Sequence, residues 1–216
     1  LSGSRPLAYP LGSELKLTQA IEEKNSLKCR EILKNIFEGL KSETDKAAVY
    51  EVSRKLSDAL TRACREQLSA LSVPSPEFEA GNGADLIFTA LNEYIDASFE
   101  EYENHNSSQL VQKIVKYLEE NYAQNITLSS LGEKFYSNSS YISRVFKQKT
   151  GKNYSDYLLD IRIDRAKQLL VSTGFSVGRI SDMVGFDNTK YFSRIFKEKT
   201  GVQPIAYRKS GGKDSV

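Results

Sequence analysis

A fourteen-residue segment that occurs twice constrains this chain more than any other feature. Residues 138–151 read NSSYISRVFKQKTG, and fifty positions later residues 188–201 read NTKYFSRIFKEKTG. Nine of the fourteen aligned positions are identical, and four of the other five are conservative exchanges. A repeat of this period indicates one supersecondary unit that is used twice. The chain must therefore form the same local structure at both places.

Each copy predicts a short amphipathic helix. An asparagine that can cap the helix stands at its start, and a glycine that can end it stands at its close. At helical spacing the apolar residues fall on one side of each copy and should pack in a core. They are Tyr141, Ile142, Val145 and Phe146 in the first copy and Tyr191, Phe192, Ile195 and Phe196 in the second.

The opposite sides of the two copies carry hydroxyls and cations but no acid. They consist of Ser140, Ser143, Arg144 and Lys147 in the first copy and Lys190, Ser193, Arg194 and Lys197 in the second, which we call the outward sets. Arginine can bind guanine through two hydrogen bonds, serine can reach base edges, and lysine can neutralise phosphate. The alternative is an ordinary solvated face whose cations suit the negative end of a helix. The repetition of the set favours a face that reads the major groove of DNA.

A second short helix is expected before each copy. Thr127 can cap a helix over residues 128–136 and Ser176 one over residues 177–184, with turns at residues 137–138 and at Gly185. Two helix-turn-helix units are therefore predicted. The apolar spacing of residues 153–174 predicts a connecting helix of about 30 Å. This length is close to the roughly 34 Å between successive major grooves on one face of a duplex, so the two units could read successive grooves.

At this point the sequence resembles the DNA-binding domain of AraC/XylS-type transcription regulators over residues 110–209. The resemblance rests on residues 141–147, on Arg162, Ala166, Leu169 and Leu170 of the connecting helix, on residues 180–186 ending Val184-Gly185-Phe186, on residues 191–197, and on Pro204, Tyr207 and Arg208. It implies seven helices that hold the two helix-turn-helix units.

The resemblance also implies which residues read bases, at the starts and outer faces of the two repeated helices. They are Ser139, Ser140, Ser143 and Arg144 in the first copy and Thr189, Lys190, Ser193 and Arg194 in the second; Lys147, Asn188 and Lys197 complete the predicted DNA-binding residues. Gly132 and Ser181 depart from the family, which usually has alanine at both positions. Because glycine lowers helix propensity by up to about 1 kcal/mol, the first unit is expected to be less rigid than usual.

Charge divides the chain into two unlike halves. Residues 1–107 carry a formal charge of −6 and residues 108–216 a charge of +8, as expected when only one half meets nucleic acid. Apolar spacing in the acidic half predicts helices at about 12–23, 26–41, 45–71 and 84–103. The prediction is an all-α chain: a helical linker or regulatory region (1–104), a hinge (105–109), the DNA-binding domain (110–209) and a disordered tail (210–216).

Nothing in the sequence argues for catalysis, a metal or a cofactor. The single histidine, His105, lies in the expected hinge, and Cys29 and Cys64 are expected to pack as reduced thiols. An alkyl-transferring DNA-repair enzyme would need a cluster of cysteines that this chain lacks. The sequence contains no run of eighteen apolar residues, so no membrane-spanning helix is predicted. The open alternative is a helical interaction or signal-relay module without DNA specificity, which would leave the outward sets unexplained.

The expected partners are double-stranded promoter DNA, RNA polymerase, and a second copy of the chain bound through the N-terminal helical region. The chain does not start with methionine, and its only methionine is Met183, so we expect it to be part of a longer protein. Residues 9–40 weakly resemble the segment between the sensor and the DNA-binding domain in membrane-tethered or multidomain regulators. This resemblance implies an upstream sensor domain and a cytoplasmic location, either free or as part of a membrane-anchored protein.

Overall fold

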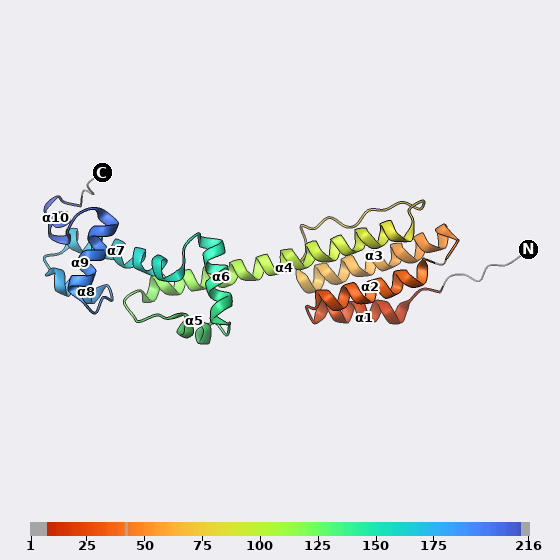
Figure 1. Ribbon diagram of the computed structural model, residues 1–216, viewed down its shortest axis with the longest axis horizontal. Coiled ribbons are helices and arrows are strands. Elements are labelled where there is room, and N and C mark those ends of the chain that lie inside the picture. The colour runs from red at the N-terminus through yellow and green to blue at the C-terminus, as the bar shows by residue number, and fades with distance from the viewer. Residues whose placement is uncertain (1–7, 42, 213–216) are drawn as a thin grey trace, which may run out of the picture. The chain divides into compact units, whose positions relative to one another are not determined.

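The computed structural model describes residues 8–41 and 43–212, and every regular element within these ranges is an α-helix (Figure 1). The all-α fold class is thereby confirmed. The chain divides into two compact units at residues 106 and 107, which we call unit 1 and unit 2. Residues 210–212 form a turn, whereas residues 213–216 of the expected tail lie outside the described residues.

Unit 1 holds three complete helices and the first part of a fourth. They are α1 (Leu11–Glu22), α2 (Ser26–Leu40), α3 (Lys46–Leu68) and residues 84–106 of α4 (Ala84–Asn121). The side chain of Asn25 accepts a hydrogen bond from the backbone of Lys28 and caps α2, and Asp45 caps α3 in the same way. The predicted bounds of α1 to α3 are confirmed to within three residues.

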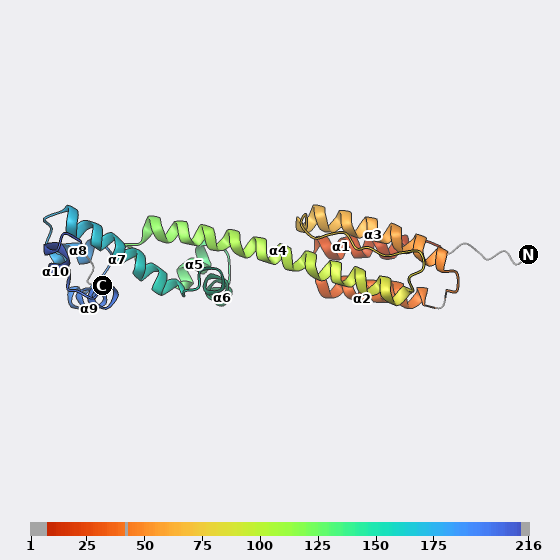
Figure 2. The same cartoon turned by 90° about the horizontal axis from the view of Figure 1, so that it is seen from above.

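One hydrophobic core holds unit 1 together. Leu17 of α1, Leu33 of α2, Leu56 of α3 and Leu91 of α4 each expose 2% of their surface or less. Figure 2 shows these four helical segments side by side. The apolar stripes that the sequence placed on each helix are therefore the inside of a helical bundle.

The fourth helix runs further than predicted. The expected end at residue 103 is wrong, because α4 continues to Asn121 through residues 105–109, where a hinge is predicted. Residues 104–108 contain neither proline nor glycine, so nothing in their backbone ends a helix. Ser107 is buried and continues the packed side of α4 toward Val111. The domain limits and a hinge at 105–109 stay predictions.

Unit 2 contains the seven helices that were expected. After residues 107–121 of α4 come α5 (Leu128–Lys134), α6 (Ser139–Thr150), α7 (Tyr154–Ser172), α8 (Val177–Met183), α9 (Thr189–Thr200) and α10 (Pro204–Lys209). The two repeated segments are α6 and α9, and α7 is the connecting helix.

Two hydrophobic cores lie within unit 2, and α7 takes part in both. Leu158 of α7 packs in the first core with α4, α5 and α6, whereas Ile163 and Leu170 pack in the second with α8, α9 and α10. Tyr122 touches both cores. The connecting helix is therefore built into each helix-turn-helix unit, which fixes where α6 and α9 lie within unit 2.

Candidate nucleic-acid interface

The two repeated helices begin in the same way. The side-chain oxygen of Asn138 accepts hydrogen bonds from the backbone of Ser140 and Tyr141. Asn188 does the same for Lys190 and Tyr191, with both distances 2.9 Å. These bonds satisfy two backbone donors that have no partner in the helix. The structure thus uses the oxygen of Asn188, a predicted DNA-binding residue, to start α9.

The two helices also end alike. Gly151 and Gly201 take left-handed conformations with φ of 75° and 79°, which glycine adopts without strain. The hydroxyls of Thr150 and Thr200 each donate 2.8 Å hydrogen bonds to the phenylalanine carbonyl four residues earlier. The identical threonines and glycines therefore end α6 and α9 in the same way.

The inner faces carry a matched aromatic contact. Phe146 meets the ring of Tyr157 edge-on and Phe196 meets Tyr207 edge-on, with centroids 5.4 Å apart in both pairs. Tyr157 and Tyr207 are fifty residues apart, so the repeat extends beyond residues 138–151 and 188–201. The same spacing, followed further along the chain, would have found them.

Both outward sets line shallow surface depressions in unit 2. The lining of the first depression is Leu128, Ser139, Ser140, Ser143, Arg144, Lys147 and Gln148. The lining of the second is Thr189, Lys190, Ser193, Arg194, Lys197, Glu198 and Gln203. Apart from Asn188, every predicted DNA-binding residue lies in one of the two linings. The hydroxyl of Ser139 donates to the carbonyl of Leu128 at 3.2 Å, so it also braces α5 against α6.

The two arginines of the outward sets take matching positions. The guanidinium of Arg144 lies over the ring of Tyr141, 5.6 Å from its centroid, and that of Arg194 lies over Tyr191 at 5.3 Å. A cation over an aromatic face is held by the negative charge of that face. Neither guanidinium hydrogen-bonds to another group within residues 8–41 and 43–212, so the ring contact orients it and leaves its donors to meet a base or phosphate.

Two residues of each lining are not among the predicted DNA-binding residues: Leu128 and Gln148 at α6, and Glu198 and Gln203 at α9. Gln148 and Glu198 occupy equivalent positions, four residues after the arginines, and join the linings of the α6 and α9 depressions. The four residues of the second outward set include no acid. The surface around them nevertheless carries one, the carboxylate of Glu198. Helical spacing could have found Gln148 and Glu198, because positions i and i+4 share a face.

An arginine of the connecting helix joins the two helix-turn-helix units. Arg162 donates 2.8 Å hydrogen bonds to the carbonyls of Tyr122 and Gln124, and its guanidinium lies over the ring of Phe186. Burial lowers the pKa of Arg162, and the nearby carboxylate of Asp187 opposes this shift. Because Arg162 bridges the segment after α4 and the turn before α9, it fixes one unit against the other.

A carboxylate of the connecting helix forms a second link. Asp160 accepts from Lys152, which follows α6, at 2.7 Å and from Lys199 near the end of α9 at 2.8 Å. Burial tends to raise the pKa of Asp160, but the hydrogen bonds and charges of the two lysines outweigh it and lower the pKa below the ordinary value. The carboxylate stays charged and ties the ends of both repeated helices to α7.

The glycine in the second unit's turn is required by a close contact. Gly185 has a φ of +84°, and a Cβ there would lie 2.6 Å from the carbonyl oxygen of Ala123. At Gly132 the oxygen of Ser137 lies 2.9 Å from where a Cβ would be. The turn backbone therefore approaches Gly132 closely, which gives this glycine a packing role beside the loss of helix propensity that the sequence suggested.

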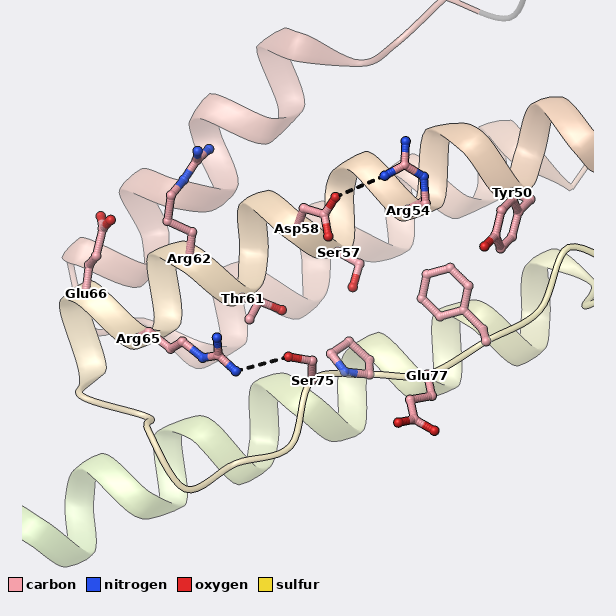
Figure 3. Close-up of a pocket in the computed structure, with 12 residues that line it drawn as sticks. Tyr50, Arg54, Ser57, Asp58, Thr61, Arg62, Arg65, Glu66, Ser75 and Glu77 are labelled. Atoms are coloured by element: carbon pink, nitrogen blue, oxygen red, sulfur yellow. Dashed lines mark hydrogen bonds and ion pairs between the residues drawn. The ribbon is translucent and has the colours of Figure 1, made fainter.

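A cavity of about 610 Å³ lies elsewhere, in unit 1, between α3 and the segment before α4 (Figure 3). In Figure 3, Arg54 reaches Asp58 and Arg65 reaches the hydroxyl of Ser75. The charged lining residues are Arg54, Arg62, Arg65, Asp58, Glu66 and Glu77. Cations and carboxylates balance there, so this cavity does not favour a polyanion as the linings of α6 and α9 do.

None of the described helices combines the length and the apolar character that crossing a membrane would require.

Comparison with known proteins places the match on unit 2. A family model described as a helix-turn-helix domain matches residues 131–210. The HTH-type transcriptional regulator YisR of Bacillus subtilis is 36% identical over 94 residues, which are 44% of this chain and 33% of the relative. The Msm operon regulatory protein of Streptococcus mutans is 28% identical over 123 residues, 57% of this chain and 44% of the relative. The chain thus spans less than half the length of these curated relatives.

Among solved structures, the C-terminal domain of the two-component response regulator yesN from Fusobacterium nucleatum is 38% identical. The match covers 48% of this chain and 98% of that one, with a TM-score of 0.43. The family model is described as a helix-turn-helix domain, and YisR is named as an HTH-type regulator. Both descriptions agree with the two helix-turn-helix units of the structure. Residues 131–210 of this chain are therefore a helix-turn-helix domain.

Proposed function

We propose that unit 2 binds double-stranded DNA through the outward faces of α6 and α9, and that the chain acts as a transcription regulator. The observation that carries the proposal is the pair of matching linings. Each presents an oriented arginine, a lysine and a serine at equivalent positions of a repeated helix. These side chains suit base edges and phosphates of the major groove.

The contacts within unit 2 support reading by both helices together. Arg162 and Asp160 connect the two helix-turn-helix units through α7, so α6 and α9 are held within one compact body. The formal charge of +8 in residues 108–216 supports attraction to phosphate. A specific site would then consist of two half-sites in successive major grooves. Contact with RNA polymerase, pairing of two copies through unit 1 and the effector stay predictions.

Fluorescence anisotropy with the full chain tests this function. The probe is a labelled duplex that spans two successive major grooves, titrated at several salt concentrations. Binding should weaken steeply as salt rises, because neutralised phosphates release their counterions. An Arg144→Ala/Arg194→Ala variant should lose most of the binding. A Lys113→Ala/Lys116→Ala variant is the control, because it removes the same charge from α4 without changing either lining.

The alternative, a helical interaction module, predicts a different result. Such a module would show no binding to the duplex at low salt, and the arginine and lysine variants would behave alike. Equal losses in the two variants would mean that only net charge matters, and would count against reading by α6 and α9.

A further inference from the structure

The linings of α6 and α9 carry the same formal charge but arrange it differently. The α6 lining has two cations, Arg144 and Lys147, and no carboxylate. The α9 lining has the equivalent Arg194 and Lys197, a third cation at Lys190, and the carboxylate of Glu198. Relative to α6, the charge of α9 is therefore shifted toward the start of the helix.

The place of Glu198 along α9 decides what it can meet on DNA. Nine residues separate it from Thr189 at the helix start, a distance of about 13 Å along a helix axis. The major groove is about 12 Å wide, and the first residues of such a helix meet the base edges. With Thr189 and Lys190 at the bases, Glu198 therefore lies at the rim of the groove beside the phosphate backbone.

The carboxylate of Glu198 forms no ion pair within the described part of the chain, although cations lie in the same lining. No hydrogen bond or ion pair joins it to another side chain in residues 8–41 and 43–212, and the guanidinium four residues earlier, on Arg194, lies over Tyr191 instead. Glu198 is exposed on the surface. A phosphate approaching this rim therefore meets a carboxylate that is not paired with a cation, whereas a phosphate at the equivalent rim of α6 meets the neutral amide of Gln148.

We propose that Glu198 weakens the binding of α9 to the DNA backbone by repelling phosphate. The binding of α9 then depends on the base contacts of its first turns, whereas α6 binds the backbone without this repulsion. The inference rests on the proposed DNA binding by unit 2. It assigns unequal roles to two helices that the repeat presents as equivalent: α6 is the anchor, and α9 is the helix whose binding is most easily lost on a poor sequence.

Exchanging Glu and Gln between positions 148 and 198 of the full chain tests the proposal. The affinity is measured for one duplex of scrambled sequence and for a panel of duplexes that each differ from it by one base pair. Glu198→Gln should bind every duplex about two to five times more tightly, the range expected for one exposed charge interaction. Its logarithmic salt dependence should change by less than one full phosphate contact, because the amide removes a repulsion of the DNA backbone but neutralises no phosphate. Gln148→Glu should weaken binding by a similar factor and make the salt dependence shallower.

The double variant Gln148→Glu/Glu198→Gln moves the carboxylate from one rim to the other. Its affinity should return close to that of the unchanged chain, because the total charge is restored and only its location differs. Glu119→Gln is the matched control: this exposed residue of α4 lies in unit 2 but in neither lining, so its loss of charge should change affinity much less than Glu198→Gln.

The outcomes separate the two proposals. If the unchanged chain does not bind any duplex, the proposed function fails. If the chain binds but Glu198→Gln and Glu119→Gln have equal affinities, only the role of Glu198 fails. A Glu198→Gln effect confined to duplexes with one particular base would also overturn the role at the rim, because it would show Glu198 to be a base reader that accepts from a cytosine amino group.

Discussion

Lys199, near the end of α9, ion-pairs with Asp160 in the middle of α7 at 2.8 Å. Asp160 also binds Lys152, so one carboxylate serves the ends of both repeated helices. Sequence spacing gives no sign of this arrangement, since Asp160 and Lys199 are thirty-nine residues apart. It provides a direct test of how far the two helix-turn-helix units depend on each other.

Asp160→Asn should destabilise unit 2 by up to about 1 kcal/mol, because the ion pairs are partly exposed and screened. The pKa of Asp160 is lowered in the folded chain, so its stabilising effect is present above its ordinary pKa of 3.8 and is lost as pH falls below it. Urea unfolding at pH 7 and pH 3 measures this. Asp164→Asn, which affects a weaker and more exposed pair in the same helix, should change little. An equal loss at both pH values would contradict the assignment.

Gly185→Ala should destabilise unit 2 by about 2–4 kcal/mol, because it combines backbone strain with a clash in a packed contact. The added Cβ would lie 2.6 Å from the oxygen of Ala123, at a φ that alanine rarely adopts. Thermal unfolding followed by circular dichroism measures the change. Gly174→Ala is the control, since no atom lies within 4 Å of its added Cβ. Similar melting temperatures for the two variants would show that the contact with Ala123 yields easily.

Tyr136 presents the opposite case in the turn of the first unit. It occupies the position equivalent to Gly185, has a φ of 50°, and exposes 97% of its surface. Because a tyrosine in the left-handed region is strained and this side chain packs on nothing, Tyr136→Gly should stabilise unit 2 by about 0.5–1 kcal/mol. Urea unfolding gives the sign. A destabilised variant would mean that the exposed ring contributes more to the turn than the strain costs.

The sequence predicted what is local in unit 2. The caps at Asn138 and Asn188, the glycine ends and the apolar spacing all act within one turn or one helix, so the repeat was enough to place α6 and α9. The outward sets followed for the same reason. Gln148 and Glu198 lie four residues after Arg144 and Arg194, so helical spacing could also have placed them on this surface, although they are not part of the outward sets.

The contacts that sequence reasoning could not supply join residues far apart in the chain. Arg162 donates a hydrogen bond to the carbonyl of Tyr122, forty residues earlier in the chain. The spacing of residues in the sequence cannot predict such a partner. The continuation of α4 was missed for a different reason. Polar residues such as Asn104 and His105 are typical of loops, yet helix propensity costs them only a few tenths of a kcal/mol each, and the packed residues on both sides keep the helix going.

The two thiols of unit 1 should be inert in the folded chain. Burial raises the pKa of Cys29 to about 12 and that of Cys64 to about 11, from an ordinary value of 9.0. Only thiolates react readily, so a thiol reagent at pH 8 should label neither cysteine until urea unfolds unit 1. Since both pKa values are raised, the stability that depends on neutral thiols is complete below pH 9 and is lost as pH rises toward 12. Rapid labelling at pH 8 without urea would show that unit 1 opens often.

The matched arginines and lysines of α6 and α9 should differ in what their removal costs. Arg144→Ala and Arg194→Ala should each weaken binding to a specific site by about 1–3 kcal/mol and relax the preference at one base pair, because an oriented guanidinium can bind guanine through two hydrogen bonds. Lys147→Ala and Lys197→Ala should weaken binding to all sequences alike and reduce the salt dependence by about one phosphate contact. Gel shifts with specific and scrambled duplexes distinguish the two effects. Arginine variants that lose the same factor on both duplexes would assign Arg144 and Arg194 to the phosphate backbone instead of the bases.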